Sequence, residues 1–514
     1  MKGLPMKAVL LCLAAIAGTT LLASCGKSIS PDQLTSELLP VPDNPLVSFR
    51  ILTKIGAAED PTGKDGLCRL TWSLLTEGGS RLRSAEDISR AFFPMAAGVS
   101  LSLDKEMAVF SATIHKDNLR AFYAMFKDML LDPGFREDDF NRLKTAQLAF
   151  VEKTLISNMD EQFGKEILNL MMYDGHPYGR YESGTVESVQ GLTVDDAKEF
   201  YREHFVRGNI TIGLAGGYPE GFPEEVRKDF EKLPAGFTPK LALPPARTPQ
   251  GLEFVLAEKD TPGTAISMGF PIALTRADKD FFALWIAGAH FGEHRQHVSL
   301  LFQKIREERG QNYGDYAYIE HFIQGRDKFP SPNHARQQQY FSIWIRPLPN
   351  SNRHFVIRQA LRELKRLVDE GLSEERFQLV RTYLLNYTKL YAQTLDERLG
   401  WRMDSHYYGY DDFLAEAAKV LPTLTRNDVN AAVKKYLQAK NVHIAVITPN
   451  AEALKEDLVS NKPSPIQYAN PNMPAEVINE DTVIQIYTLE VKPENVRVVA
   501  AGEFFRQTGI PGGR

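Results

Sequence analysis

The sequence predicts an α+β protein made of two similar units, each a mainly antiparallel sheet with helices packed on it. The first observation is an internal match, because residues 131–140 align with residues 368–377 without a gap and share Asp, Gly, Glu and Phe in step. The second is that residues 192–196 align with residues 424–428 at nearly the same offset, which indicates a duplicated unit. The third is size: with 514 residues, 43% of them hydrophobic, the chain can form two or more cores.

The first unit is expected over residues 46–233. Short β-prone runs alternate with stretches of helical spacing, and Ser84 with Asp87 predicts the start of a helix. Asp104 and Lys105 are expected to turn a hairpin. The strands are expected at residues 46–55, 99–103, 107–114 and 210–214, and the helices at residues 71–75, from 84, 118–131, 137–157 and 194–203.

A linker and a second unit follow. Residues 234–249 contain five prolines, which is typical of a linker. The second unit, residues 250–450, is expected to have strands at 254–257, 265–269 and 340–345, helices at 279–289 and up to about 399, and a last helix and strand ending at 447. Residues 451–514 are expected to be an extension with one β-like run at 482–491, not a third domain.

The N-terminus predicts export and a lipid anchor. Two lysines precede the apolar residues 8–22, which are too few to span a bilayer and are typical of a signal peptide. Small residues followed by Cys25 resemble a bacterial lipoprotein box, so residues 1–24 are expected to be removed, Cys25 acylated, and residues 25–45 left as a tether. The alternative is an ordinary signal peptide with a coincidental cysteine. The residues after Cys25 lack the aspartate that favours inner-membrane retention, which favours the outer membrane, facing the periplasm.

Charge and cysteine content narrow the function further. A net charge of -5 gives no basic patch, so no nucleic-acid partner is expected. Cys68 would be the one thiol left in the mature chain once Cys12 is removed and Cys25 carries lipid. Neither an intrachain disulfide nor a cysteine-based zinc site is then expected.

The most informative stretch is residues 298–318, which is expected to form a helix, a glycine stop and a strand. Its apolar residues recur at helical spacing, and Gly310 stands where a left-handed C-cap would end the helix. This puts the guanidinium of Arg306 near the helix end and the phenol of Tyr313 at the start of the next strand. Such a pair can hold a carbonyl or an oxyanion. The alternative is a solvated charge run beside a core tyrosine.

Short motifs along residues 46–450 resemble the M16 peptidase family, which includes insulinase, pitrilysin and mitochondrial processing peptidase. They stand in the family's order: Gly56 with Asp60-Pro61 and Gly63, Gly66-Leu67, Thr76-Glu77-Gly78-Gly79, His176-Pro177-Tyr178-Gly179, and Ile305-Arg306-Glu307 with Tyr313. The resemblance implies two homologous M16-type α/β sandwich units that form a half-clamp. In the family an arginine and a tyrosine at this spacing, in the enzyme or in its partner subunit, grip the substrate backbone and the developing oxyanion.

The resemblance also implies that the family's zinc site is lost in this chain. Active members carry zinc on an inverted H-x-x-E-H helix directly after the Gly-Leu step, and Arg69, Trp72 and Ser73 occupy its His, Glu and His positions here. Arginine repels a cation, tryptophan cannot act as a base, and serine is a poor zinc ligand. The third ligand would fall at residues 149–152, where Glu152 alone cannot hold zinc. No metal is therefore expected in the chain.

A second stretch fits the zinc motif literally, His290-Phe291-Gly292-Glu293-His294. Zinc binding would need a continuous helix to align His290 with His294, and the preceding helix is expected to stop before Gly292. Surface or capping histidines are the favoured interpretation. The alternative is a zinc site, to which His297 could add a ligand.

These observations favour a lipid-anchored M16-like subunit without its own zinc. It would supply Arg306 and Tyr313 to a partner that bears H-x-x-E-H and zinc, and the two would enclose a peptide for endoproteolysis. Two alternatives stay open. One is a structural or binding M16-like protein without a peptidase role, and the other is a self-contained zinc peptidase that uses His290 and His294.

Overall fold

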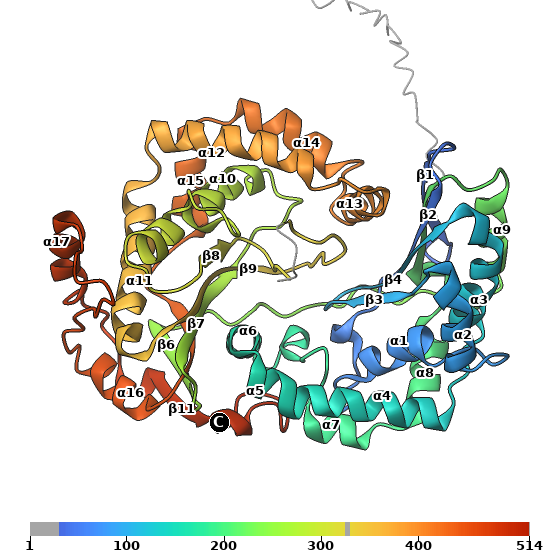
Figure 1. Cartoon of the computed structure of the whole chain (residues 1–514), viewed down its shortest axis with the longest axis horizontal. Coiled ribbons are helices and arrows are strands. Elements are labelled where there is room, and N and C mark those ends of the chain that lie inside the picture. The colour runs from blue at the N-terminus through green and yellow to red at the C-terminus, as the bar shows by residue number, and fades with distance from the viewer. Residues whose placement is uncertain (1–29, 324–328, 513–514) are drawn as a thin grey trace, which may run out of the picture.

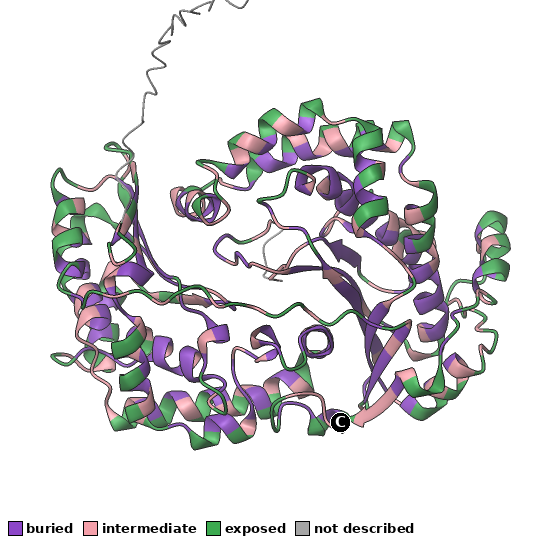
Figure 2. Ribbon diagram, turned by 180° about the vertical axis from the view of Figure 1, so that it is seen from behind, coloured by how far each residue is buried: buried purple, intermediate pink, exposed green. Residues whose placement is uncertain are grey.

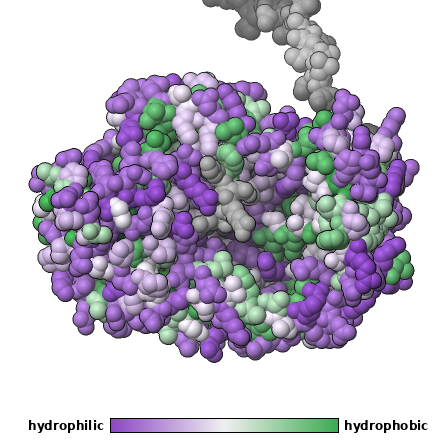
Figure 3. Space-filling model, in the orientation of Figure 1, coloured by the Kyte–Doolittle hydropathy of each residue, from purple (hydrophilic) through white to green (hydrophobic). Residues whose placement is uncertain are grey.

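The computed structural model describes residues 30–323 and 329–512 (Figure 1). The expected signal peptide and the expected acylation site, Cys25, lie outside the described residues. Two sheets stand on opposite sides of the molecule, with helices outside and between them (Figure 1). None of the described helices is long and apolar enough to cross a membrane. The face seen in Figure 3 is mostly hydrophilic, with hydrophobic residues in small scattered groups.

The two sheets have the same strand order, as the duplication predicts. The first sheet has the order β1-β5-β2-β4-β3 and the second β11-β6-β10-β7-β9-β8. The first sheet has one parallel pair, β1 with β5, and the second has the matching pair β6 with β10. The second sheet also carries β11, which adds to the edge of β6 in a further parallel pair, and the remaining neighbours in both sheets are antiparallel. The strands are β1 (Thr35–Pro40), β2 (Leu46–Thr53), β3 (Ser100–Leu103), β4 (Ala108–His115), β5 (Ile210–Gly216), β6 (Leu252–Glu258), β7 (Gly263–Ile272), β8 (Asp315–Tyr318), β9 (Gln339–Pro349), β10 (Val442–Thr448) and β11 (Val496–Ala500). The α+β prediction is confirmed.

One face of each sheet packs on helices of its own unit. Phe49 of β2 meets Phe126 of α3 at a ring distance of 5.5 Å, and Phe341 of β9 meets Phe291 of α10 at 6.2 Å. The helix expected over residues 137–157 is interrupted by a π-helical turn, Phe150–Leu155. The helices are α1 (Leu67–Glu77), α2 (Ala85–Phe92), α3 (Leu119–Leu131), α4 (Glu137–Ala149), α5 (Ile156–Asn158), α6 (Asp160–Met172), α7 (Val186–Gly191), α8 (Val194–His204), α9 (Phe222–Phe230), α10 (Phe281–Gly292), α11 (Arg353–Glu370), α12 (Glu374–Tyr387), α13 (Leu395–Tyr407), α14 (Phe413–Val420), α15 (Arg426–Tyr436), α16 (Ala451–Val459) and α17 (Ala475–Ile484).

The other face of each sheet is covered by a helix from the opposite unit. Helix α6 packs on β7 and β10 of the second sheet, and α13 packs on β1, β2 and β5 of the first. The contacts are close at two glycines: a Cβ on Gly164 of α6 would lie 3.3 Å from Ser267 Oγ, and one on Gly400 of α13 would lie 3.0 Å from the Arg50 guanidinium. Buried residues therefore run through both halves of the molecule (Figure 2).

Two sequence-based expectations outside the matched blocks are wrong. Residues 35–40, expected within a tether, form the edge strand β1, because its ladder with β5 and the pairing of Glu37 with Arg402 at 2.7 Å hold a short polar segment in the sheet. The β-like run at 482–491 instead begins inside helix α17. Val477 and Ile484 on α17 are buried. Their packing stabilises a helix and outweighs the preference of the β-prone side chains for a strand. The strand of the extension comes later, as β11.

Candidate functional site

The turn that carries Arg306 has the predicted helix, stop and strand. Its helical part is a π-helical turn, Phe302–Glu307, in which Phe302 and Ile305 are buried. Gly310 has φ +62°, in the left-handed region, and its N–H donates to the Arg306 carbonyl at 2.7 Å. Strand β8 then begins at Asp315. The glycine lets the chain reverse without strain and fixes where the strand starts.

On this turn Arg306 is half-buried and Tyr313 is exposed. The Arg306 guanidinium lies 4.7 Å from the Phe302 ring centre, and its Nη1 is 3.1 Å from Glu307 Oε1. The Tyr313 side chain is 79% exposed, which is unusual for a large aromatic residue. The alternative of a core tyrosine is wrong. The Arg306 guanidinium contacts only its own helical turn among these neighbours, and the Tyr313 phenol is unpacked. Both groups can therefore bind a ligand that approaches this surface.

Buried polar contacts hold the base of the turn. Asp315 accepts a hydrogen bond from Asn312 Nδ2 at 2.7 Å. Burial raises the pKa of Asp315 well above its usual value, although Arg346 and Arg306 act against the shift. Arg346 in turn pairs with Glu161 of α6 at 2.6 Å. The turn is therefore tied to a helix of the first unit, and its surface groups are presented from a fixed base.

The C-terminal extension braces the same turn. The fully buried Arg309 side chain pairs with Glu480 and Asp481 of α17, each at 2.9 Å, and Lys304 pairs with Glu480 at 3.1 Å. Sequence reasoning missed Arg309 and these acids. The signal was weak, since adjacent acids in a helix are ordinary at a surface and only the fold brings them to Arg309.

Helix α1, at the place of the family's zinc helix, is part of the core. Its N-terminus is fixed by Asp60, whose carboxyl accepts from the Gly66 N–H at 2.7 Å and the Cys68 N–H at 2.6 Å. The Cys68 side chain is buried, and burial raises the pKa of its thiol well above the usual value. The cysteine therefore packs as a small apolar group.

The residues at the zinc-motif positions do not fit a zinc ion. Trp72 is fully buried, and its ring lies 5.5 to 5.9 Å from those of Phe110, Phe200 and Phe205. Arg69 and Ser73 are half-buried, and Glu152 is exposed on the turn after α4. Over residues 30–323 and 329–512, no group of three or more His, Cys, Asp or Glu side chains could hold a metal. The residues at the zinc-motif positions therefore do not form a zinc site.

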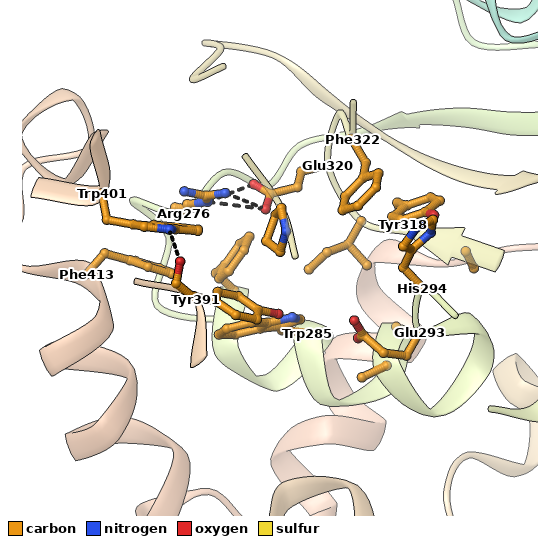
Figure 4. Close-up of a pocket in the computed structure, with 16 residues that line it drawn as sticks. Arg276, Trp285, Glu293, His294, Tyr318, Glu320, Phe322, Tyr391, Trp401 and Phe413 are labelled. Carbon is orange, nitrogen blue, oxygen red and sulfur yellow. Dashed lines mark hydrogen bonds and ion pairs between the residues drawn. The ribbon is translucent and has the colours of Figure 1, made fainter. Parts of the chain in front are cut away.

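The literal H-x-x-E-H stretch is divided by the end of α10. The helix includes His290 and closes at Gly292, where a Cβ would lie 2.3 Å from the Ala317 nitrogen of β8. His294 therefore leaves the helix, and its Nδ1 lies 2.6 Å from the Tyr318 hydroxyl (Figure 4). The expected helix end at residue 289 is three residues early. Both histidines are buried, so the surface-histidine interpretation is wrong, but they lack the continuous helix that the zinc alternative needs.

The duplicated pair of sheets and the helices exchanged between the units give the chain an M16-like fold, in which α1 is part of the core. Residues 191–384 match the family model described as "Peptidase M16 inactive domain". A solved peptidase M16 inactive domain from Pseudomonas fluorescens superposes with a TM-score of 0.70 at 18% identity, covering 82% of this chain and 96% of that one. Residues 191–384 are thus similar to an M16 inactive domain, and the whole fold is similar to that of solved M16-type chains.

Two bacterial relatives cover most of the chain. An "Uncharacterized zinc protease" of Streptomyces coelicolor is 25% identical over 421 residues, 78% of this chain and 84% of its own length. A "Non-peptidase homolog" of Helicobacter pylori is 20% identical over 392 residues, 74% of this chain and 84% of its own length. The names span both active and inactive proteins, so the residues of the site must decide between them.

Proposed function

We propose that this chain is the zinc-free subunit of an M16-type endopeptidase and that it supplies Arg306 and Tyr313 to a partner bearing H-x-x-E-H. One observation carries the proposal. A half-buried cation, Arg306, and a 79% exposed phenol, Tyr313, stand on a braced turn, in a chain whose own zinc-motif positions hold Arg69, Trp72 and Ser73. In this proposal the reacting centre therefore comes from another chain.

In the proposed complex the peptide lies between the two chains. The Arg306 guanidinium and the Tyr313 hydroxyl donate hydrogen bonds to the substrate carbonyl, and they bind it more tightly as negative charge develops on its oxygen. The chemistry of hydrolysis would be supplied by the zinc site of the partner. The contacts of Arg306 with Glu307 and with the Phe302 ring weaken when the guanidinium turns to the substrate. The half-exposed Glu307 is screened by solvent, so losing the ion pair costs little.

The proposed location is the periplasmic face of the outer membrane, with the chain held by lipid on Cys25. The supporting observation is the N-terminal sequence itself, an apolar run followed by small residues and a cysteine. Because β1 begins at Thr35, the tether would be shorter than the sequence suggests, and the body would stay near the membrane. Labelling with a radioactive fatty acid, lost in Cys25→Ser, tests the anchor.

A structural or binding role without proteolysis is the second candidate. It is favoured by the relative named a non-peptidase homolog. That role needs no chemistry from Arg306 or Tyr313, whereas the first proposal depends on both.

The deciding experiment co-expresses this chain with an M16 subunit that bears H-x-x-E-H and measures cleavage of an unfolded peptide. We expect Arg306→Ala to lower kcat by about 10²–10³, the usual effect of losing one oxyanion donor, and Tyr313→Phe to act in the same direction. Arg202→Ala, on the exposed side of α8, is the matched control. Full activity of both variants in an intact complex would contradict the proposal, and no cleavage with the unaltered chain would favour the second candidate.

A further inference from the structure

A small cavity at the C-terminal end of α10 has walls made mainly of aromatic rings. It measures ≈ 50 Å³, and Trp285, Tyr391 and Trp401 are among its lining residues (Figure 4). Since a water-sized group occupies about 10–15 Å³ in such a measure, the cavity holds about three to five of them. It can take the end of a side chain but not a whole amino acid.

One half of this cavity already holds a cation of the chain. The guanidinium of Arg276 pairs with Glu320 at 2.9 Å, and its central carbon lies 4.7 Å from the Trp401 ring centre and 5.0 Å from that of Phe413. A cation between a carboxylate and aromatic faces is stabilised both by the opposite charge and by the ring quadrupoles. In this half of the cavity the carboxylate of Glu320 therefore already has a cationic partner.

In the other half, the described lining residues supply a carboxylate but no cation. Glu293 follows the end of α10, and its carboxyl points into the cavity towards Trp285 (Figure 4). Among the residues that the structure describes, no cationic side chain forms an ion pair with Glu293. The adjacent His294 supplies no positive charge, because burial lowers its pKa to about 3. The carboxylate also stands at a helix C-terminus, whose partial negative charge repels it.

We propose that this half of the cavity binds a primary ammonium group, such as the end of a lysine side chain, between the Glu293 carboxylate and the rings of Trp285 and Tyr391. The ligand's ammonium group would lie between a carboxylate and aromatic rings, as the Arg276 guanidinium does in the other half of the cavity. The size of the cavity admits a CH₂–NH₃⁺ end. The inference does not rest on Arg306, Tyr313 or a partner chain.

The test is titration of the purified chain with n-butylammonium at pH 8, followed by calorimetry and by the fluorescence of the cavity tryptophans. We expect saturable binding at one site that weakens at least tenfold in Glu293→Gln, a substitution of nearly equal size. Glu452→Gln, at an exposed position on α16, should leave the affinity unchanged. Equal affinity in Glu293→Gln, or equal binding of the neutral butan-1-ol, would overturn the proposal.

The pH dependence gives a second readout. Burial raises the pKa of Glu293 to about 7, so the carboxylate is mostly ionised at pH 8 and mostly protonated at pH 6. Affinity for n-butylammonium should therefore fall about tenfold between pH 8 and pH 6, and the fall should vanish in Glu293→Gln. Asp404, which pairs with Arg276, also has a pKa raised by burial, to about 6. Because Asp404 is still present in Glu293→Gln, a pH effect that comes from Asp404 would persist in that variant, whereas one that comes from Glu293 would not. The other titratable or charged groups around Glu293 are His294, Glu320, Tyr318, Tyr383, Tyr387 and Tyr391.

Thermal unfolding shows whether the variant is folded and supplies an independent check. The folded-state pKa of Glu293 lies above its unfolded value, so the protonated form favours the fold, and stability is lost as pH rises through 7. Without ligand, Glu293→Gln should raise Tm at pH 8 and leave it nearly unchanged at pH 5. A lower Tm at both values would indicate a merely structural role for the carboxyl and would overturn the proposal.

Discussion

The two units share a strand order but differ at the helix that follows the second strand of each sheet. In the first unit this helix is α1, which buries Trp72 in the core. In the second unit it is α10, which ends at Gly292 and leads through a short connection to the half-buried Arg306 and the exposed Tyr313. A duplicated fold therefore does not imply a duplicated site. One unit serves as scaffold, and the other presents polar groups to the outside.

The scaffold role of α1 can be broken at Trp72. Trp72→Ala removes a fully buried indole from a cluster of three phenylalanine rings, and we expect a loss of about 3–5 kcal/mol in the free energy of unfolding. Trp285→Ala, at a partly buried position of α10, should cost less. Urea unfolding followed by circular dichroism measures both. Similar losses of unfolding free energy in the two variants would show that α1 and α10 contribute equally to the core, against this expectation.

A second variant tests how firmly the units are joined. Asp104, in the hairpin of the first unit, accepts from Arg336 Nε of the second at 2.8 Å, and both side chains are buried. Asp104→Asn leaves the guanidinium buried without its countercharge, which should destabilise the chain by about 3 kcal/mol. Asp132→Asn, which breaks the exposed pair with Arg81, is the control and should change stability by less than about 1 kcal/mol.

The same pair predicts a pH dependence. Burial alone would raise the pKa of Asp104, but Arg336 and His321 outweigh it and hold this pKa well below the usual value. A depressed carboxyl pKa contributes stability that is present above the unfolded-state pKa and is lost as pH falls. The unaltered chain should therefore lose more stability than Asp104→Asn as the solution is acidified below about pH 4. Parallel acid-unfolding curves would contradict this assignment.

What the sequence predicts correctly depends on local pattern. The left-handed Gly310 and the end of α10 near Gly292 follow from short-range rules. The likeness of the two sheets follows from the internal match of the sequence with itself. What it misses depends on distant contacts. Strand β1 exists through its ladder with β5, and α17 is fixed by the buried Arg309, neither of which has a local signature. The pairing of the half-buried Arg306 and the exposed Tyr313 with a substrate stays a prediction.

The smallest expected effects come from two matched helix caps, one in each unit. Because the caps stand at aligned positions, they compare the two units directly. Thr193 of the first unit and Thr425 of the second occupy the same place in the aligned blocks, and each makes a capping box at the start of α8 or α15. Thr193→Ala and Thr425→Ala should each cost about 1 kcal/mol in urea unfolding.

The partners of these caps differ, and so should the effects of changing them. Asp196 in the first cap also pairs with Lys64 at 2.5 Å, whereas Asp428 in the second is partnered by its own Thr425. The loss of unfolding free energy in Asp196→Asn should be larger than that in Asp428→Asn, but by less than about 1 kcal/mol. The difference is small because Lys64 is partly exposed and the solvent screens its pair with Asp196. Both losses should appear in a single transition, since α6 and α13 each cross to the opposite sheet. Two separate transitions, one per cap, would mean that the exchanged helices do not couple the units.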